Sequence, residues 1–177
     1  MTHRMLSTAA AAALLSAGVA YAEGVEIYAL DMLDNTQAGY CLDIAGGQGP
    51  QADPGNGLQG HTCYSPSGEL FVDQTFELDR FADGVLFMPE FDVCAQVDGL
   101  EAGSAVSLAA CDGSDAQSFA FSGEGTITPA SATGMCLTLG EDTRSGRSDA
   151  NQIKTLTLEE CSDEAAARQT WGNRTAG

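Results

Sequence analysis

The chain has 177 residues and a formal net charge of −18 at pH 7, with 25 acidic residues against 7 lysines and arginines. A field of that sign repels phosphate backbones and anionic lipid head groups, so nucleic acid and bare membrane surfaces are not expected as partners. The length is sufficient for one domain with a hydrophobic core of its own.

Residues 1–22 are expected to be a cleaved export signal. Arg4 supplies a positive start, residues 9–20 form an apolar, alanine-rich stretch, and an Ala-Tyr-Ala motif at 20–22 has the small-x-small pattern of a signal-peptidase site. The apolar stretch is shorter than the roughly 20 residues that span a bilayer, so no membrane span is expected. We therefore predict cleavage after Ala22, a secreted or periplasmic location, and a folded domain of residues 23–177.

Beyond the signal, short strand-like runs alternate with turns. Alternating or apolar runs of strand length occur at residues 25–30, 85–88, 106–108, 118–121 and 156–158. Clusters of Gly, Pro, Asp, Asn and Ser, typical of turns, lie at residues 46–50, 53–57 and 122–125. No window has apolar residues at helical spacing over enough length for a core helix, and only residues 163–168 suggest a helical turn. The pattern predicts an all-β fold.

Six cysteines fall into three pairs, and each pair is followed by glutamine, one residue and an aromatic. The closing motifs are Gln74-Thr75-Phe76, Gln117-Ser118-Phe119 and Gln169-Thr170-Trp171. A unit written three times predicts three equivalent repeats, at about residues 25–80, 81–124 and 125–172. In an oxidising compartment an even set of cysteines indicates disulfides. Because equivalent repeats should close in the same way, we expect the bonds Cys41–Cys63, Cys94–Cys111 and Cys136–Cys161.

The sequence predicts no bound metal or other cofactor, and it predicts no catalytic activity. No cysteine pair has C-x-x-C spacing, and the acidic segments 92–101 and 112–115 do not match the calcium-loop pattern, although calcium binding there stays open. Beyond the signal the chain has one histidine, His61, and it lacks the nucleophile-elbow, zinc-protease and phosphate-loop motifs. Paired carboxylates for glycoside hydrolysis stay an alternative, because so acidic a sequence singles out no pair.

The closing residues have a physical role that their spacing suggests. Phe76, Phe119 and Trp171, one per repeat, are expected to converge on a threefold axis, where large aromatics supply the most buried area. Gln74, Gln117 and Gln169 precede them by two residues, and a glutamine amide there can link the backbones of neighbouring strands. We interpret all six side chains as structural.

Three cysteine pairs in step with three Q-x-aromatic motifs resemble the ricin-B-type lectin family, over about residues 25–172. The resemblance implies a β-trefoil of three repeats, each with a start like Cys41-Leu42-Asp43 and a Q-x-W end. It also implies carbohydrate binding, with galactose-type glycans as the candidate class. The alternative within the same family is a protein-interaction scaffold without sugar binding, such as the non-catalytic subunit of a toxin complex.

The resemblance also implies where a sugar would bind. In the family, an acid two residues after the first cysteine takes hydroxyls, a ring two residues before the second covers the sugar's C–H face, and an Asn or Asp beside the closing glutamine completes the site. In repeat one these positions hold Asp43, His61, and Asp73 beside Gln74, with Tyr64 as a reserve ring.

Repeats two and three depart from that pattern. The acid is replaced by Gln96 and Thr138, the ring by Ala109 and Glu159, and the partner of the glutamine by Ala116 and Arg168. We therefore expect at most one working site, in repeat one.

A basic loop at residues 140–152 also stands out in this acidic chain. Together with Lys154, it carries Arg144 and Arg147. It is expected to be solvated, as loops usually are. Alternatively, it binds a protein partner.

Overall fold

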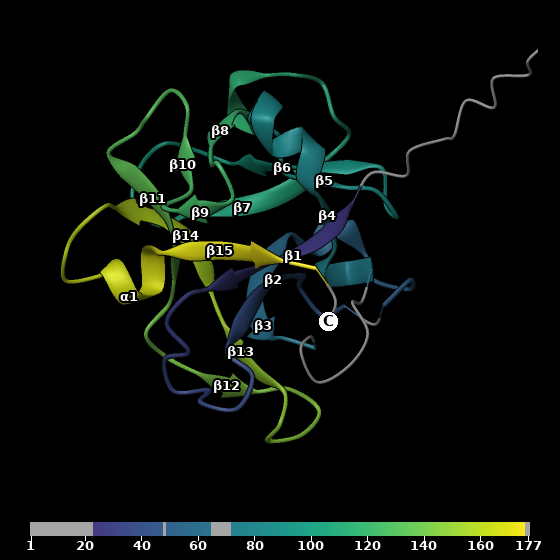
Figure 1. The fold of residues 1–177 in the computed structure, drawn as a ribbon, viewed down its shortest axis with the longest axis vertical. Coiled ribbons are helices and arrows are strands. Elements are labelled where there is room, and N and C mark those ends of the chain that lie inside the picture. The colour runs from purple at the N-terminus through teal and green to yellow at the C-terminus, as the bar shows by residue number, and fades with distance from the viewer. Residues whose placement is uncertain (1–22, 48, 65–71, 176–177) are drawn as a thin grey trace, which may run out of the picture.

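The computed structural model describes residues 23–47, 49–64 and 72–175 (Figure 1). The expected signal, residues 1–22, lies outside this part of the chain, so its cleavage stays a prediction. Within the described ranges, no helix has the length and apolar character needed to cross a membrane.

Twelve of the strands form three sets of four, one set for each sequence repeat. Repeat one contains β1 (Gly24–Ala29), β2 (Tyr40–Ile44), β3 (Leu58–Thr62) and β4 (Phe76–Glu77). Repeat two contains β5 (Phe87–Met88), β6 (Val93–Val97), β7 (Ser104–Ala109) and β8 (Phe119–Ala120). Repeat three contains β10 (Thr128–Pro129), β11 (Met135–Leu139), β14 (Leu156–Glu160) and β15 (Trp171–Arg174).

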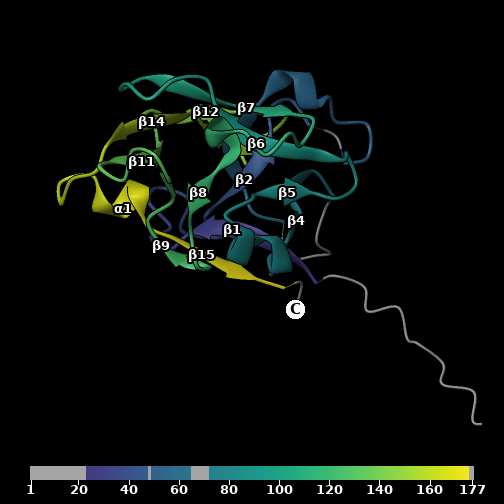
Figure 2. The ribbon, with the colours of Figure 1, turned by 90° about the horizontal axis from the view of Figure 1, so that it is seen from above.

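Within each repeat the two middle strands form an antiparallel hairpin, and the outer strands join the repeats. The hairpins are β2–β3, β6–β7 and β11–β14. Strand β8 pairs with β10, and β15 pairs with β1, so the last strand of the chain closes on the first. Seen from above, β6, β7 and β14 lie at one end of the molecule and β1, β9 and β15 at the other (Figure 2). This arrangement is a β-trefoil, which confirms the expected fold.

The repeated aromatic residues lie in the core. Phe76 and Trp171 are fully buried and Phe119 is 3 % exposed, and all three belong to one hydrophobic cluster with side chains from every repeat. The indole Nε1 of Trp171 donates a hydrogen bond to the Leu137 carbonyl at 3.0 Å, so its polar atom has a partner despite the burial. One large ring from each repeat thus fills the shared centre of the fold.

Several local expectations need correction. The helical turn α1 spans Ala166–Gln169, a few residues later than predicted, and the run at 85–88 contributes only β5. Part of the expected turn at 122–125 is strand β9 (Glu124–Gly125), which pairs with β15. Short 3₁₀ turns occur at Pro54–Asn56, Val72–Gln74, Leu78–Asp83 and Asp115–Gln117. The first of these lies within the predicted turn cluster at residues 53–57, whereas the other three are too short to leave a periodic pattern in the sequence.

The loop between β11 and β14 is docked against repeat one, although its residues 144–150 are exposed to solvent as expected. It forms the strands β12 (Arg144–Ser145) and β13 (Gln152–Lys154), and β13 pairs with β3 of repeat one, which places Ile153 opposite His61 (Figure 1). Its residue Lys154 is 3 % exposed, and its Nζ lies 3.2 Å from Asp34 of repeat one and donates to the Glu141 carbonyl at 2.8 Å. The loop of repeat three therefore docks on repeat one, where β13 and β12 add two strands beside the β2–β3 hairpin.

Candidate functional site

Each closing glutamine makes the same three hydrogen bonds in its own repeat. Its amide nitrogen donates to the side chain two residues after the first cysteine and to the carbonyl just before the second cysteine. Its amide oxygen accepts from the backbone N–H just after the second cysteine. In repeat one, Gln74 makes these bonds to Asp43 Oδ2, the Thr62 carbonyl and the Tyr64 N–H, at 3.0, 3.2 and 3.3 Å.

The other two repeats match this pattern atom for atom. Gln117 bonds to Gln96 Oε1, the Ala110 carbonyl and the Asp112 N–H at 3.4, 2.9 and 2.9 Å. Gln169 bonds to Thr138 Oγ1, the Glu160 carbonyl and the Ser162 N–H at 2.9, 2.9 and 3.0 Å. All three glutamines are at most 2 % exposed. The glutamine thus fixes the hairpin ends and orients whichever side chain follows the first cysteine.

The six cysteines form the three expected bonds, one closing each hairpin. The bonds Cys41–Cys63, Cys94–Cys111 and Cys136–Cys161 have Cα separations of 5.0 to 5.1 Å. Each removes loop entropy from the unfolded chain, which is worth about 3 kcal/mol for loops of this size.

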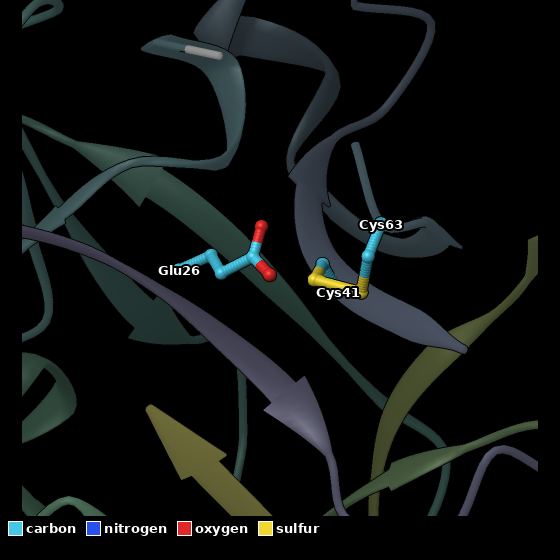
Figure 3. Close-up of side chains that lie close together, drawn as sticks. All are labelled: Glu26, Cys41 and Cys63. Carbon is cyan, nitrogen blue, oxygen red and sulfur yellow. A yellow bond between two sulfur atoms is a disulfide. The ribbon is translucent and has the colours of Figure 1, made fainter. Parts of the chain in front are cut away.

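One of these bonds lies beside a buried carboxylate, that of Glu26 (Figure 3). The sulfurs of Cys41 and Cys63 are bonded to each other and offer no thiolate to a metal ion. Glu26 itself pairs with Arg174. This group of residues therefore lacks the ligand set of a metal centre.

The acid of repeat one, Asp43, is held between two amides. It is 2 % exposed on β2 and lies opposite Gln59 of β3. Gln59 Nε2 donates to its Oδ1 at 2.9 Å, and Gln74 donates to its Oδ2. Burial raises the pKa of Asp43 to about 7, with a smaller contribution from the nearby charge of Asp73, although both amides act in the opposite direction. Near neutral pH the carboxyl therefore exists in both its charged and its neutral form.

The rings of His61 and Tyr64 lie beside Asp43, with their centroids 5.3 Å apart and their planes tilted by 39°. Burial lowers the pKa of His61, so its imidazole is neutral at pH 7. The Nδ1 of His61 lies 2.9 Å from the Thr62 carbonyl and therefore carries the proton, which leaves Nε2 as an acceptor. Burial, with the charges of Asp43 and Asp73, raises the pKa of Tyr64 to about 12, so its hydroxyl stays protonated.

These groups line a cleft of about 550 Å³, which we call the repeat-one cleft. Repeat one supplies Asp43, Gln59, His61 and Tyr64, together with the glycine-rich loop that follows β2. The docked loop of repeat three supplies Gly146, Arg147, Asn151 and Ile153. Arg144, which precedes the lining residue Gly146 by two positions, donates from Nη2 to Gln59 Oε1 at 3.2 Å. The cleft is therefore built by two repeats.

The structure does not bring all four expected sugar-contacting residues to this cleft. Asp43 and His61 line it, whereas Asp73 and Gln74 are buried behind it. Asp73 Oδ2 accepts a hydrogen bond from the Gly49 N–H at 2.7 Å. A Cβ atom on Gly47 would come within 2.7 Å of the same oxygen. Asp73 thus anchors the glycine-rich wall of the cleft, and Gln74 orients Asp43.

The equivalent surfaces of repeats two and three are different. The cleft beside Gln117 and the cleft beside Gln169 are lined by no aromatic ring. In repeat three, Arg168 of the cleft is already paired with Glu141, at 3.1 Å. Neither surface offers the combination of acid and rings that repeat one has.

Sequence reasoning missed the residues that reach the cleft from across a strand or from another repeat. Gln59 has a local signal, because it lies two residues before His61 and therefore on the same face of the strand as the ring. Arg147 was singled out only as part of a basic loop. Neither it nor Asn151 has a local signal for this cleft, because both follow Asp43 by about a hundred residues and arrive only when β13 pairs with β3.

Comparison with known proteins agrees with this architecture. Residues 30–171 match the family model of the ricin-type beta-trefoil lectin domain, which confirms the resemblance seen in the sequence. No curated protein sequence matches the chain.

Solved structures share the fold at low sequence identity. A mutant of the earthworm lectin C-terminal domain in complex with 6'-sialyllactose has a TM-score of 0.56 at 18 % identity, over 86 % of this chain and 98 % of that one. The β-trefoil lectin of the Vibrio vulnificus hemolysin/cytolysin, with N-acetyl-D-lactosamine bound, has a TM-score of 0.53 at 16 % identity, over 88 % and 96 %. The designed threefold-symmetric protein ThreeFoil has 0.54 at 16 %, over 85 % and 96 %. At these identities the likeness concerns the fold alone.

Proposed function

We propose that this chain, which belongs to the ricin-type β-trefoil lectin family, is an exported carbohydrate-binding protein with a single working sugar site, the repeat-one cleft. One observation carries the choice of site. Three hairpins have the same disulfide and the same glutamine bonds, but only the first also has a carboxylate and two rings at its cleft.

The side chains of the cleft suggest how a sugar would be held. Asp43 and Gln59 would take a pair of hydroxyls, and Nε2 of His61 would accept a third. Tyr64 is the better platform for the C–H face of the ring, because it is half-buried and larger, whereas His61 is 7 % exposed. In this proposal Asp73 and Gln74 contribute by positioning the wall and the acid.

We expect binding without catalysis. Glycoside hydrolysis uses two carboxyl groups on opposite sides of the scissile bond. The repeat-one cleft is lined by one, Asp43, because Asp73 lies behind the glycine-rich wall. His61 has no carboxylate hydrogen-bonded to its Nδ1 that would orient it as a catalytic base.

A glycan array followed by titration of galactose-type sugars tests the proposal. Asp43→Ala should weaken binding by about 1.5–3 kcal/mol, the usual loss when a charged hydrogen-bond partner is removed. Gln96→Ala and Thr138→Ala are the matched controls, because these residues hold the same position in repeats two and three, and both should bind as wild type does. Near-ultraviolet circular dichroism checks that each variant is folded.

Two outcomes would contradict this function. One is the absence of binding to any glycan, and the other is an Asp43→Ala variant that binds as tightly as the wild type. The alternative function, a protein-interaction scaffold, is favoured by the near-complete burial of Asp43 and by the absence of aromatic rings from the clefts described in the other repeats, which hold Gln96 and Thr138 at the position of Asp43. Recovery of a defined protein partner from the native host, with no glycan bound on the array, would support the scaffold.

A further inference from the structure

Most of the basic residues that the structure describes are paired with a carboxylate, but two arginines are not. The described residues contain six lysines and arginines, and four of them have a carboxylate oxygen within 4.0 Å: Arg80, Lys154, Arg168 and Arg174. In the described part of the chain, the two cations without such a partner are Arg144 and Arg147. With 25 acidic residues available, unpaired arginines are the exception and call for a physical reason.

Both unpaired arginines lie at the repeat-one cleft. Arg147 is exposed and lines the cleft together with Asp43 and Tyr64. Arg144 donates a hydrogen bond to the amide oxygen Oε1 of Gln59, and Gln59 in turn donates to Asp43. The positive charge of Arg147 acts to lower the pKa of Tyr64, which opposes the stronger effect of burial on that pKa. The positive charge of Arg144 acts to lower the pKa of His61, in the same direction as the stronger effect of burial. Their fields therefore reach the residues proposed to hold the sugar.

We propose that the repeat-one cleft binds a sugar that carries a carboxylate, with the acid group on Arg147 and the neutral hydroxyls on Asp43 and Gln59. This inference rests on the sugar-binding function proposed above and specifies the chemical class of the ligand. A guanidinium presents paired N–H donors that match the two oxygens of a carboxylate.

The remaining charges around the cleft are compatible with an anionic ligand. Asp43 is the one carboxylate in its lining, and burial raises the pKa of this group to about 7, which reduces its negative charge near neutral pH. Asp73 lies behind the glycine-rich wall, bonded to the Gly49 N–H. The distant acids that give the chain its net charge are screened over roughly 8 Å at physiological ionic strength.

The test compares matched neutral and acidic sugars on the full protein. Methyl galactoside and methyl galacturonide, and the corresponding glucose pair, are titrated by isothermal calorimetry at low and high salt. The acidic member of a recognised pair should bind about ten- to a hundredfold more tightly at low salt, as charge-assisted hydrogen bonds do, and salt should reduce this preference.

Variants of Arg147 then assign the preference to a residue. Arg147→Gln should reduce the ratio of acidic to neutral sugar affinity to about one, and Arg147→Lys should retain part of the preference. Arg80→Gln is the control, because it removes the same charge from a half-buried arginine outside the cleft, paired with Asp83. Arg147 is exposed, so its replacement should not unfold the chain.

The outcomes separate this inference from the function on which it rests. If neutral sugars bind as tightly as acidic ones, or if Arg147→Gln keeps the preference, the carboxylate assignment is wrong while the sugar site stands. If no member of any pair binds and no glycan binds on the array, both proposals are wrong.

Discussion

The hairpins of repeats one and three share one framework and differ in what that framework presents. In each, a disulfide joins the hairpin ends and the closing glutamine bonds to the side chain two residues after the first cysteine. That side chain is Asp43 in repeat one and Thr138 in repeat three. In this protein, the residues that stabilise the fold recur in all three repeats, whereas the acid and the rings that line the candidate site occur in one.

The same comparison shows that the candidate site belongs to two repeats. The loop of repeat three leaves its own hairpin and pairs through β13 with β3 of repeat one, where Asp34 accepts hydrogen bonds from Tyr40 and Thr143 and lies 3.2 Å from Lys154. Repeat three thereby loses a loop from its own surface and completes the cleft of its neighbour. A repeated scaffold can concentrate its function in one copy in this way.

The largest expected effect comes from breaking this connection. Asp34→Ala should leave the charge of Lys154 buried without its carboxylate, at a cost of about 3 kcal/mol in the free energy of unfolding, near the low end for buried pairs because Asp34 is half-exposed. Lys154→Met, which removes the buried charge itself, should cost much less. Urea denaturation measures both, and equal costs would show that the charge of Lys154 does not hold the loop.

A smaller effect should separate framework from site. Gln74→Ala, Gln117→Ala and Gln169→Ala each leave a backbone carbonyl and a backbone N–H without their partner, so each should lower the free energy of unfolding by about 1–3 kcal/mol. Only Gln74→Ala should also weaken glycan binding, because only Gln74 orients an acid. Loss of glycan binding in the Gln117 or Gln169 variant would mean that the site is not confined to repeat one.

A third effect should appear as a pH dependence specific to repeat one. The pKa of Asp43 is about 7 in the folded chain against an ordinary 3.8, so the folded state binds the extra proton and is favoured at low pH. This contribution is fully present below about pH 4 and is lost as the pH rises toward 7, by about 1.4 kcal/mol for each pH unit. Asp43→Asn removes this titration, so its stability relative to wild type should rise between pH 4 and 7 and level off above.

Asp34 should make a contribution to stability with the opposite dependence on pH. Burial pushes the pKa of Asp34 upward, but hydrogen bonds from Thr143, Tyr40 and Lys154 outweigh it and lower the pKa to about 2. The stability that Asp34 contributes is present above pH 3.8 and is lost as the pH falls toward 2. Asp34→Asn should therefore alter the pH profile of unfolding only in that acid range. A wild-type profile matching that of Asp43→Asn above pH 4 would disprove the raised pKa of Asp43.

The sequence by itself determined the features that repeat along the chain. Cysteine pairs and Q-x-aromatic motifs in register predicted three repeats, their disulfides and the three core aromatics at Phe76, Phe119 and Trp171, because these interactions form within each repeat or at the symmetric centre. The family resemblance pointed to Asp43 and His61 as one site, and the two lie on one face of the β2–β3 hairpin because alternation along paired strands is a local property.

Only the tertiary structure decided how the cleft is completed. Three features join segments about a hundred residues apart: the pairing of β13 with β3, the salt bridge between Lys154 and Asp34, and the arrival of Arg147 at the cleft that Asp43 lines. No local pattern encodes such a contact, because its free energy comes from burying one surface against another after both have folded. The placement of Asp73 behind the wall, against Gly47 and Gly49, was decided by the same packing.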